Sequence, residues 1–182
     1  MTPEFKSYPS ISRLSRDVVV TEKLDGSNAQ VHIYTEDSEL KIIAGSRNRW
    51  LTAEQDNFGF AKWVENNKDQ LLTLGEGTHF GEWWGSGIQV GYGLAEKRFS
   101  LFNTGLWNDA NTPDCCHVVP ILHEGEFDMA VIDGILQGLK ESGSVAAPGF
   151  MKPEGVVVYH KHSNTMFKKT IKNDEAGKSY GS

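Results

Sequence analysis

Residues 18–28 read Val18-Val19-Val20-Thr21-Glu22-Lys23-Leu24-Asp25-Gly26-Ser27-Asn28, an apolar, β-branched run that leads into a lysine, an acid and a glycine. The first part predicts a strand, and Lys23 falls at its end. A lysine in this place can be aimed into a pocket as a nucleophile, provided that its amine is held in the neutral form. Lys-x-Asp-Gly is also ordinary turn chemistry, in which Asp25-Gly26 would close a hairpin onto the alternating residues 29–34. Taken alone, the stretch favours the hairpin over a catalytic lysine. The choice between them depends on the other motifs of the chain.

The composition places the chain among globular proteins. Its 182 residues are 38% hydrophobic and 23% charged, which predicts one soluble domain with a sizeable core. No apolar run approaches the roughly 20 residues of a membrane span, and residues 1–6 lack a signal-peptide core. We therefore expect a cytoplasmic protein without a membrane partner. The adjacent Cys115 and Cys116 have no second pair with which to complete a metal site, so we expect free thiols.

The charge distribution bears on nucleic-acid binding. A net charge of −6 argues against a protein that coats nucleic acid through a uniformly basic surface. It is compatible with a local basic groove, because residues 161–178 contain five lysines against Asp174 and Glu175.

Hydrophobic periodicity predicts many strands and few helices. Strands are expected at 17–24, 29–35, 40–45, 78–84, 98–103, 118–123, 155–160 and 165–171. One helix is expected at 53–70, with Thr52 as N-cap, and a second between a capping Asp128 and Gly143. Without strict strand-helix alternation, this pattern predicts an α+β fold on antiparallel sheets, and without repeats or linkers it predicts one domain over residues 1–182.

Polar residues recur where five of these strands begin or end, which is how a sheet-walled pocket gathers catalytic groups. The five stretches are Glu22-Lys23-Leu24-Asp25-Gly26, Gly45-Ser46-Arg47-Asn48, Phe80-Gly81-Glu82, Pro153-Glu154-Gly155-Val156-Val157 and Met166-Phe167-Lys168-Lys169-Thr170. The glycine-rich residues 81–93 carry no phosphate-loop or dinucleotide signature, so their glycines are expected to turn the chain at a strand end.

In order and content these stretches resemble the nucleotidyltransferase motifs of the covalent ligases and mRNA capping enzymes. The resemblance spans about residues 20–172 and is closest to the ATP-dependent RNA ligases that seal nicks in duplex RNA. It implies an antiparallel-sheet adenylation domain, ATP and Mg²⁺ or Mn²⁺ as cofactors, and RNA as partner, as a nicked duplex or RNA/DNA hybrid. The chain ends ten residues after Lys172. We therefore expect a stand-alone, monomeric adenylation domain without an OB-type domain.

The resemblance also implies roles for residues of the first two stretches. Lys23 would attack the α-phosphate of ATP and carry AMP. Glu22 would help to read the adenine amino group, and Arg47 would contact the nucleotide sugar and phosphate. Asn28 would support the sealing steps. Without the family, Arg47 would be a surface arginine and Asn28 a turn residue.

The two glutamates and an aromatic residue complete the implied nucleotide site. Glu82 would lie near the ribose and the metal, and Glu154 would orient or bind the metal through a hard oxygen ligand. Phe102 would stack on the adenine, with Phe99 as the competing candidate, because a core phenylalanine looks the same in sequence.

The last stretch departs from the family pattern, in which two lysines spaced Lys-x-Lys contact the α-phosphate. Lys168 and Lys169 are adjacent and must point to opposite faces of a regular strand. Lys168 aligns best, whereas Lys169 or Lys172 would need a bulge to take the second contact.

Three other functions stay open on sequence grounds. A minimal DNA ligase shares the chemistry, but the continuation Asp25-Gly26-Ser27-Asn28 and the missing OB-type module favour RNA. A capping guanylyltransferase also normally needs that module and takes GTP. A non-catalytic nucleotide- or nucleic-acid-binding module would have no need of Lys23 together with two metal-ordering carboxylates.

Overall fold

The computed structural model describes residues 2–11, 14 and 16–172, which fold into two sheets. The four-stranded sheet has the order β7 (Ile121–Glu126), β1 (Asp17–Lys23), β8 (Gly155–His160) and β9 (Thr165–Thr170). The five-stranded sheet has the order β3 (Glu39–Ser46), β2 (Ser27–Glu36), β4 (Gly77–Gly85), β5 (Lys97–Leu101) and β6 (Cys116–Val118). Neighbouring strands are antiparallel except β5 and β6. The expected α+β class is confirmed. Lys178, in the basic C-terminal stretch, lies outside the described residues.

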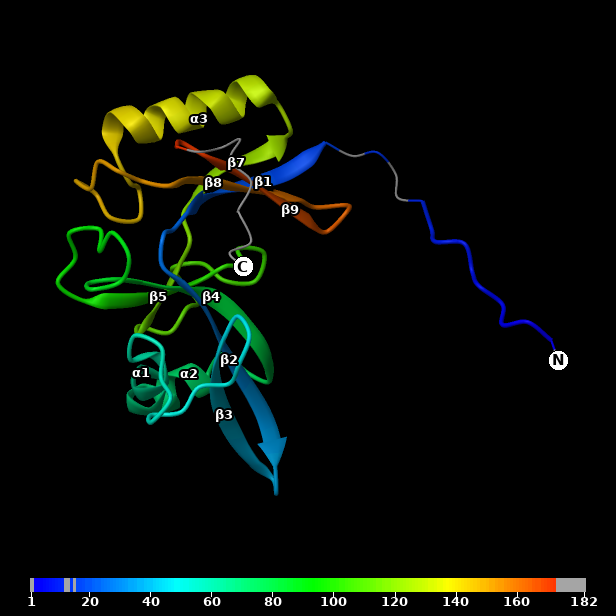
Figure 1. Cartoon of the computed structure of the whole chain (residues 1–182), viewed down its shortest axis with the longest axis vertical. Helices are drawn as coiled ribbons and strands as arrows, with labels where there is room; N and C mark the ends of the chain where they lie inside the picture. Colours follow the sequence, from blue (N-terminus) through cyan, green and yellow to red (C-terminus); the bar gives the residue numbers. More distant parts are fainter. Residues whose placement is uncertain (1, 12–13, 15, 173–182) are drawn as a thin grey trace, which may run out of the picture.

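Each sheet is covered by helix on one face (Figure 1). Helices α1 (Phe60–Asn66) and α2 (Lys68–Leu72) pack on the five-stranded sheet, and α3 (Met129–Ser142) packs on the four-stranded one. No helix in these described segments is long and apolar enough to cross a membrane. The two cysteines are free thiols, as expected.

One of the two expected helices begins where the sequence predicted, and the other begins later. The helix expected at 53–70 begins only at Phe60, because Phe58 and Gly59 have φ of 51° and 77°, outside the helical region. Its first turn is held by Asp56, whose carboxylate accepts the amides of Ala61 and Lys62, so Thr52 is not the cap. Helix α3 is as expected, since the Asp128 carboxylate accepts the Ala130 amide at 2.8 Å and Gly143 ends the helix.

The hairpin expected at Asp25-Gly26 is not formed. Strand β1 pairs with β7 and β8, whereas β2 pairs with β3 and β4, so residues 24–26 carry the chain from one sheet to the other. The chain returns at residues 119–120, which splits the strand expected at 118–123 into β6 and β7. Leu24 and Val119 meet at these two crossings in a small buried cluster with Trp84, Tyr92 and Ala147.

Gly26 makes the first crossing possible. A Cβ at this position would lie 2.5 Å from the Trp83 carbonyl oxygen and 2.7 Å from the Trp84 Cβ, closer than real side chains approach. The backbone after Lys23 can therefore lie directly against β4 only if residue 26 has no side chain.

We predict that Gly26→Ala lowers the free energy of unfolding by about 1–3 kcal/mol, because the added methyl forces the crossing segment away from β4. Denaturant unfolding measures this. Gly134→Ala is the matched control, since a Cβ there meets nothing within 4 Å and alanine suits a helix better than glycine. Equal stability of the two variants would contradict the packing constraint at Gly26.

Candidate active site

Lys23 and Glu154 form the centre of the site. The Lys23 Nζ donates to the Glu154 Oε1 at 2.8 Å, and both side chains are partly exposed. They meet because Lys23, the last residue of β1, pairs with Gly155 at the start of β8. Gly155 has φ of 151°, and a Cβ there would lie 2.2 Å from the Lys169 carbonyl oxygen. The glycine after Glu154 thus lets β8 and β9 run together where the carboxylate meets the lysine.

The second carboxylate oxygen, Glu154 Oε2, is buried and has no hydrogen-bond partner among the described residues. Such an atom costs free energy unless a ligand or cation satisfies it. It points to a positively charged or hydrogen-donating group that belongs at this position.

Glu82 brings a second carboxylate to the site from the other sheet. It lies opposite Asn28 in the β2–β4 ladder, and its Oε1 accepts the Gly26 amide at 3.2 Å. Burial raises the pKa of Glu82 to about 7, against the opposing effects of Lys23, the Gly26 amide and Arg47; Glu154 adds to the rise. Near neutral pH this carboxyl is therefore partly protonated and would bind a cation in its ionised form.

Asp25 and Tyr92 shape the backbone after the nucleophile. The Asp25 amide donates to the Tyr92 hydroxyl at 2.7 Å, and Tyr92 packs edge-on against Trp84 at 4.8 Å between ring centroids. Burial, and next the Glu154 charge, raise the pKa of Asp25, which Lys23 lowers. Tyr92 was not predicted from the sequence, since the glycine-rich residues 81–93 indicate a turn but not which side chain folds back to the Asp25 amide.

Glu22 lies on the other face of β1. Successive residues of β1 point to opposite faces, so Glu22 faces away from the Lys23 side and is only 1% exposed. Its two oxygens accept bonds from the Ser144 hydroxyl at 2.6 Å and the Val145 and Ala146 amides, each at 2.9 Å. In this structure the Glu22 carboxylate anchors residues 144–146, and its contact with the adenine stays a prediction.

Of the two adjacent lysines, the structure places Lys168 on the Lys23 side. It pairs with Val157, which pairs with Thr21, two residues from Lys23 in β1. Lys169 lies on the opposite face, where its Nζ is 3.1 Å from an Asp133 carboxylate oxygen of α3. The β8–β9 register has no shift, so the bulge that would turn Lys169 to the Lys23 side is not formed.

The remaining predicted site residues differ in how far they are exposed to solvent. Phe99 is fully buried against Phe60 and Trp63, which removes it as a stacking candidate, while Phe102 is 37% exposed just beyond β5. Arg47 is exposed in the turn after β3 and close enough for its charge to act on Glu82. Asn28 stands beside Glu82 on the same face of the sheet.

The donors present suit a hard cation that arrives with a nucleotide. Glu154 and Glu82 supply two carboxylates, and the described residues contain no group of three or more His, Cys, Asp or Glu side chains placed to hold a metal by themselves. Mg²⁺ is commonly bound by one or two carboxylates together with waters and substrate phosphates. The buried, unpartnered Glu154 oxygen fits that arrangement.

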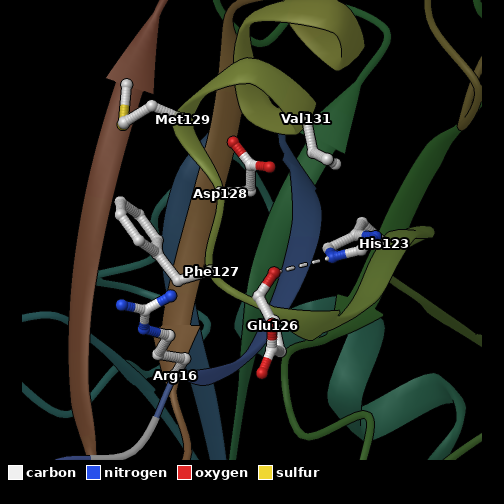
Figure 2. Close-up of a pocket in the computed structure, with 7 residues that line it drawn as sticks. All are labelled: Arg16, His123, Glu126, Phe127, Asp128, Met129 and Val131. Carbon is white, nitrogen blue, oxygen red and sulfur yellow. Dashed lines mark hydrogen bonds between the residues drawn. The ribbon is translucent and has the colours of Figure 1, made fainter.

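A cavity of about 570 Å³ lies elsewhere in the molecule (Figure 2). It is lined by residues at the start of β1, the end of β7 and the first turn of α3, among them Arg16, His123 and Phe127. His123 pairs with Val20, whose side chain packs against α3, so this lining residue lies on the face opposite to the Lys23 side. Arg16 precedes the far end of β1. The cavity is therefore not part of the Lys23 site.

The two-sheet fold and the lysine–carboxylate site define a nucleotidyltransferase domain. A model of the RNA ligase family matches residues 16–173, and the chain therefore belongs to the RNA ligase family. No curated protein sequence matches it significantly.

Solved structures of a Naegleria gruberi RNA ligase share the fold. A lysine-to-alanine mutant without ligand and an arginine-to-alanine mutant with ATP and Mn each superpose with a TM-score of 0.61 at 25% identity. A glutamate-to-alanine mutant with AMP and Mn superposes with a TM-score of 0.60 at 25% identity. The matches cover 85%, 85% and 84% of this chain and 49% of each relative, so the chain spans about half the length of these proteins.

The raised pKa of Glu82 predicts a specific pH dependence of stability. An unfolded glutamate titrates near pH 4.3, whereas folded Glu82 titrates near 7. Between these values the folded state holds more protons, so stability falls as pH rises, and the loss is complete above the folded pKa. Thermal melts at pH 5 and pH 8 should show a smaller decline for Glu82→Gln than for the wild type. Glu65→Gln, an exposed change in α1, should decline like the wild type, and equal slopes in all three proteins would contradict the assignment.

Proposed function

We propose that this chain is the adenylation domain of an ATP-dependent RNA ligase, which joins 3′-hydroxyl and 5′-phosphate ends. The observation that carries the proposal is the meeting of Lys23 with Glu154 from the same sheet and Glu82 from the other. The family match and the ATP, AMP and Mn named for the Naegleria structures support ATP and a divalent cation as cofactors.

In the first step the neutral Lys23 amine attacks the α-phosphorus of ATP. A nitrogen–phosphorus bond forms, the bond to the bridging oxygen of the β-phosphate breaks, and pyrophosphate leaves with that electron pair. The amine proton passes to solvent or to a nearby carboxylate. The Glu154 contact holds Lys23 in place before the reaction.

Glu154 and Glu82 would hold the divalent cation in this step. Bound there, Mg²⁺ or Mn²⁺ would neutralise phosphate charge and compete with Lys23 for the Glu154 carboxylate. Lys168 lies on the same side of its sheet as Lys23, and Arg47 is close enough for its charge to act on Glu82. Both cations would stabilise negative charge on the phosphates. Phe102 would stack on the adenine.

The remaining two steps move AMP through the polynucleotide. A 5′-phosphate oxygen attacks the lysyl-AMP phosphorus, which frees Lys23 and leaves a 5′-to-5′ pyrophosphate. A 3′-hydroxyl then attacks the 5′-phosphate, AMP leaves and a phosphodiester forms. Asn28, which lies opposite Glu82 in the β2–β4 ladder, would assist these sealing steps.

We predict that wild-type protein incubated with labelled ATP and Mg²⁺ forms an acid-stable, hydroxylamine-labile AMP adduct that Lys23→Ala cannot form. Lys168→Ala should slow adduct formation by about 10-fold or more, since a charge on the phosphate is lost. Autoradiography of denatured protein measures both effects.

Lys169→Ala is the matched control, because this lysine lies on the α3 face and pairs with Asp133. It should form the adduct at close to the wild-type rate, since a partly exposed ion pair contributes little to stability. A defect equal to that of Lys168→Ala, or an adduct in Lys23→Ala, would count against the assignment of the nucleophile and its helper.

A second prediction concerns the acceptor. Nicked duplexes of all four strand compositions should be sealed best when the 3′-hydroxyl belongs to RNA, because the 2′-hydroxyl beside it is where RNA and DNA differ. Gel separation of ligated product measures the rates. Sealing of DNA-terminated nicks alone would identify a DNA ligase instead.

A further inference from the structure

One face of the five-stranded sheet carries no helix in the described part of the chain. The other face packs on α1 and α2 through Ala29, Val31 and Ile33 of β2. Alternation therefore turns Asn28, Gln30, His32 and Tyr34 to the open face, the same face as Glu82.

The register arranges the open face in rows that cross the strands. The first row contains Asn28 and Glu82 of the active site. Two residues further along β2, about 7 Å away, the second row contains Gln30 and, opposite it, Phe80 of β4. The Phe102 amide donates to the Phe80 carbonyl at 3.0 Å, which brings Phe102 into the same row.

Trp50 completes the second row at the β3 end. Gly45 pairs with Gln30, and a Cβ on Gly45 would lie 3.0 Å from the Trp50 ring, so the indole lies over this glycine. The ring also approaches His32 of the third row, at 6.0 Å between centroids. Trp50 is 51% exposed and Phe80 is 50% exposed, so two large aromatic faces meet solvent one row from the catalytic carboxylate.

Polar groups separate these rings. Gln30 stands between Trp50 and Phe80, and in the third row His32 lies 2.8 Å from the Thr78 hydroxyl. Neither row contains an acidic residue, and the exposed Arg47 lies near the Glu82 end. An interface core for another protein would be a continuous apolar patch. Aromatic rings interleaved with amide, imidazole and hydroxyl groups on an open sheet face instead suit unpaired nucleobases, which stack and hydrogen bond.

We propose that this open face, defined by Trp50, Gln30, His32, Phe80 and Thr78, binds unpaired nucleotides of the RNA that is being joined. The proposal rests on the proposed ligase function and adds a substrate feature to it. Bases within a duplex already stack on one another and cannot lie on a sheet, so the strand that leaves the active site over this face is single-stranded. The preferred substrates would then have an unpaired segment beside the joint rather than a continuous nicked duplex.

The test measures binding of a short single-stranded RNA that carries 2-aminopurine, and of a fully paired nicked duplex of the same sequence. Trp50→Ala and Phe80→Ala should each weaken single-strand binding about tenfold and reduce the quenching of 2-aminopurine. The dependence of affinity on salt should not change, since no phosphate contact is removed. Duplex binding should change by less than the single-strand binding.

Two kinds of control separate stacking from folding. Trp50→Tyr and Phe80→Tyr keep an aromatic face and should bind nearly as well as the wild type. Leu40→Ala removes an apolar side chain of similar exposure, 43%, from the opposite face of β3 and should have no effect. Formation of the AMP adduct, which involves no RNA, should proceed in all the variants and confirms that they fold.

Several results would overturn the proposal. These are unchanged RNA affinity in both alanine variants, an equal loss for the nicked duplex, or a wild-type oligomer that Trp50→Ala dissociates, which would assign the face to a second copy. Absence of the adduct in the wild type would instead contradict the proposed function, so the two failures are distinguishable.

Discussion

The passage of the chain between its two sheets at residues 24–26 is the constraint on which the site depends. Gly26 lies so close to the Trp83 carbonyl that no side chain fits, and its amide donates to Glu82. Asp25 is tied by its own amide to Tyr92. Lys23, directly before these residues, is therefore held where one sheet gives way to the other, and the carboxylates of both sheets reach it.

When no ligand is bound, one lysine faces three carboxyl groups at this junction. Lys23 stands among Glu154, Asp25 and Glu82, and burial raises the pKa of both Asp25 and Glu82. One Glu154 oxygen has no partner in the described structure. Burying carboxylates costs free energy that a bound cation recovers, so a site of this kind gains stability and takes on its charged form when phosphates and a divalent ion enter together.

The two-residue period of a strand decides which of two adjacent candidates reaches the site. It turns Lys23 and Lys168 to one side, and Glu22 and Lys169 to the other, where α3 and residues 144–146 satisfy them. The sequence predicted that Lys168 and Lys169 point to opposite faces, and the structure confirms it. For Glu22 the resemblance implied a nucleotide contact, whereas the alternation of β1 turns its side chain to Ser144.

Sequence by itself determined most of the strands, helix α3 with its Asp128 cap, and the residue types gathered for the site, because these depend on local periodicity and on side chains within a few positions. Tertiary structure alone decided that β1 and β2 join different sheets, that Tyr92 supports Asp25, and that the helix expected at 53–70 starts late. The contacts responsible join distant positions: 131 residues separate Lys23 from Glu154, 122 separate Glu22 from Ser144, and 67 separate Asp25 from Tyr92. No local pattern specifies such pairs, since each arises only when the two sheets have packed.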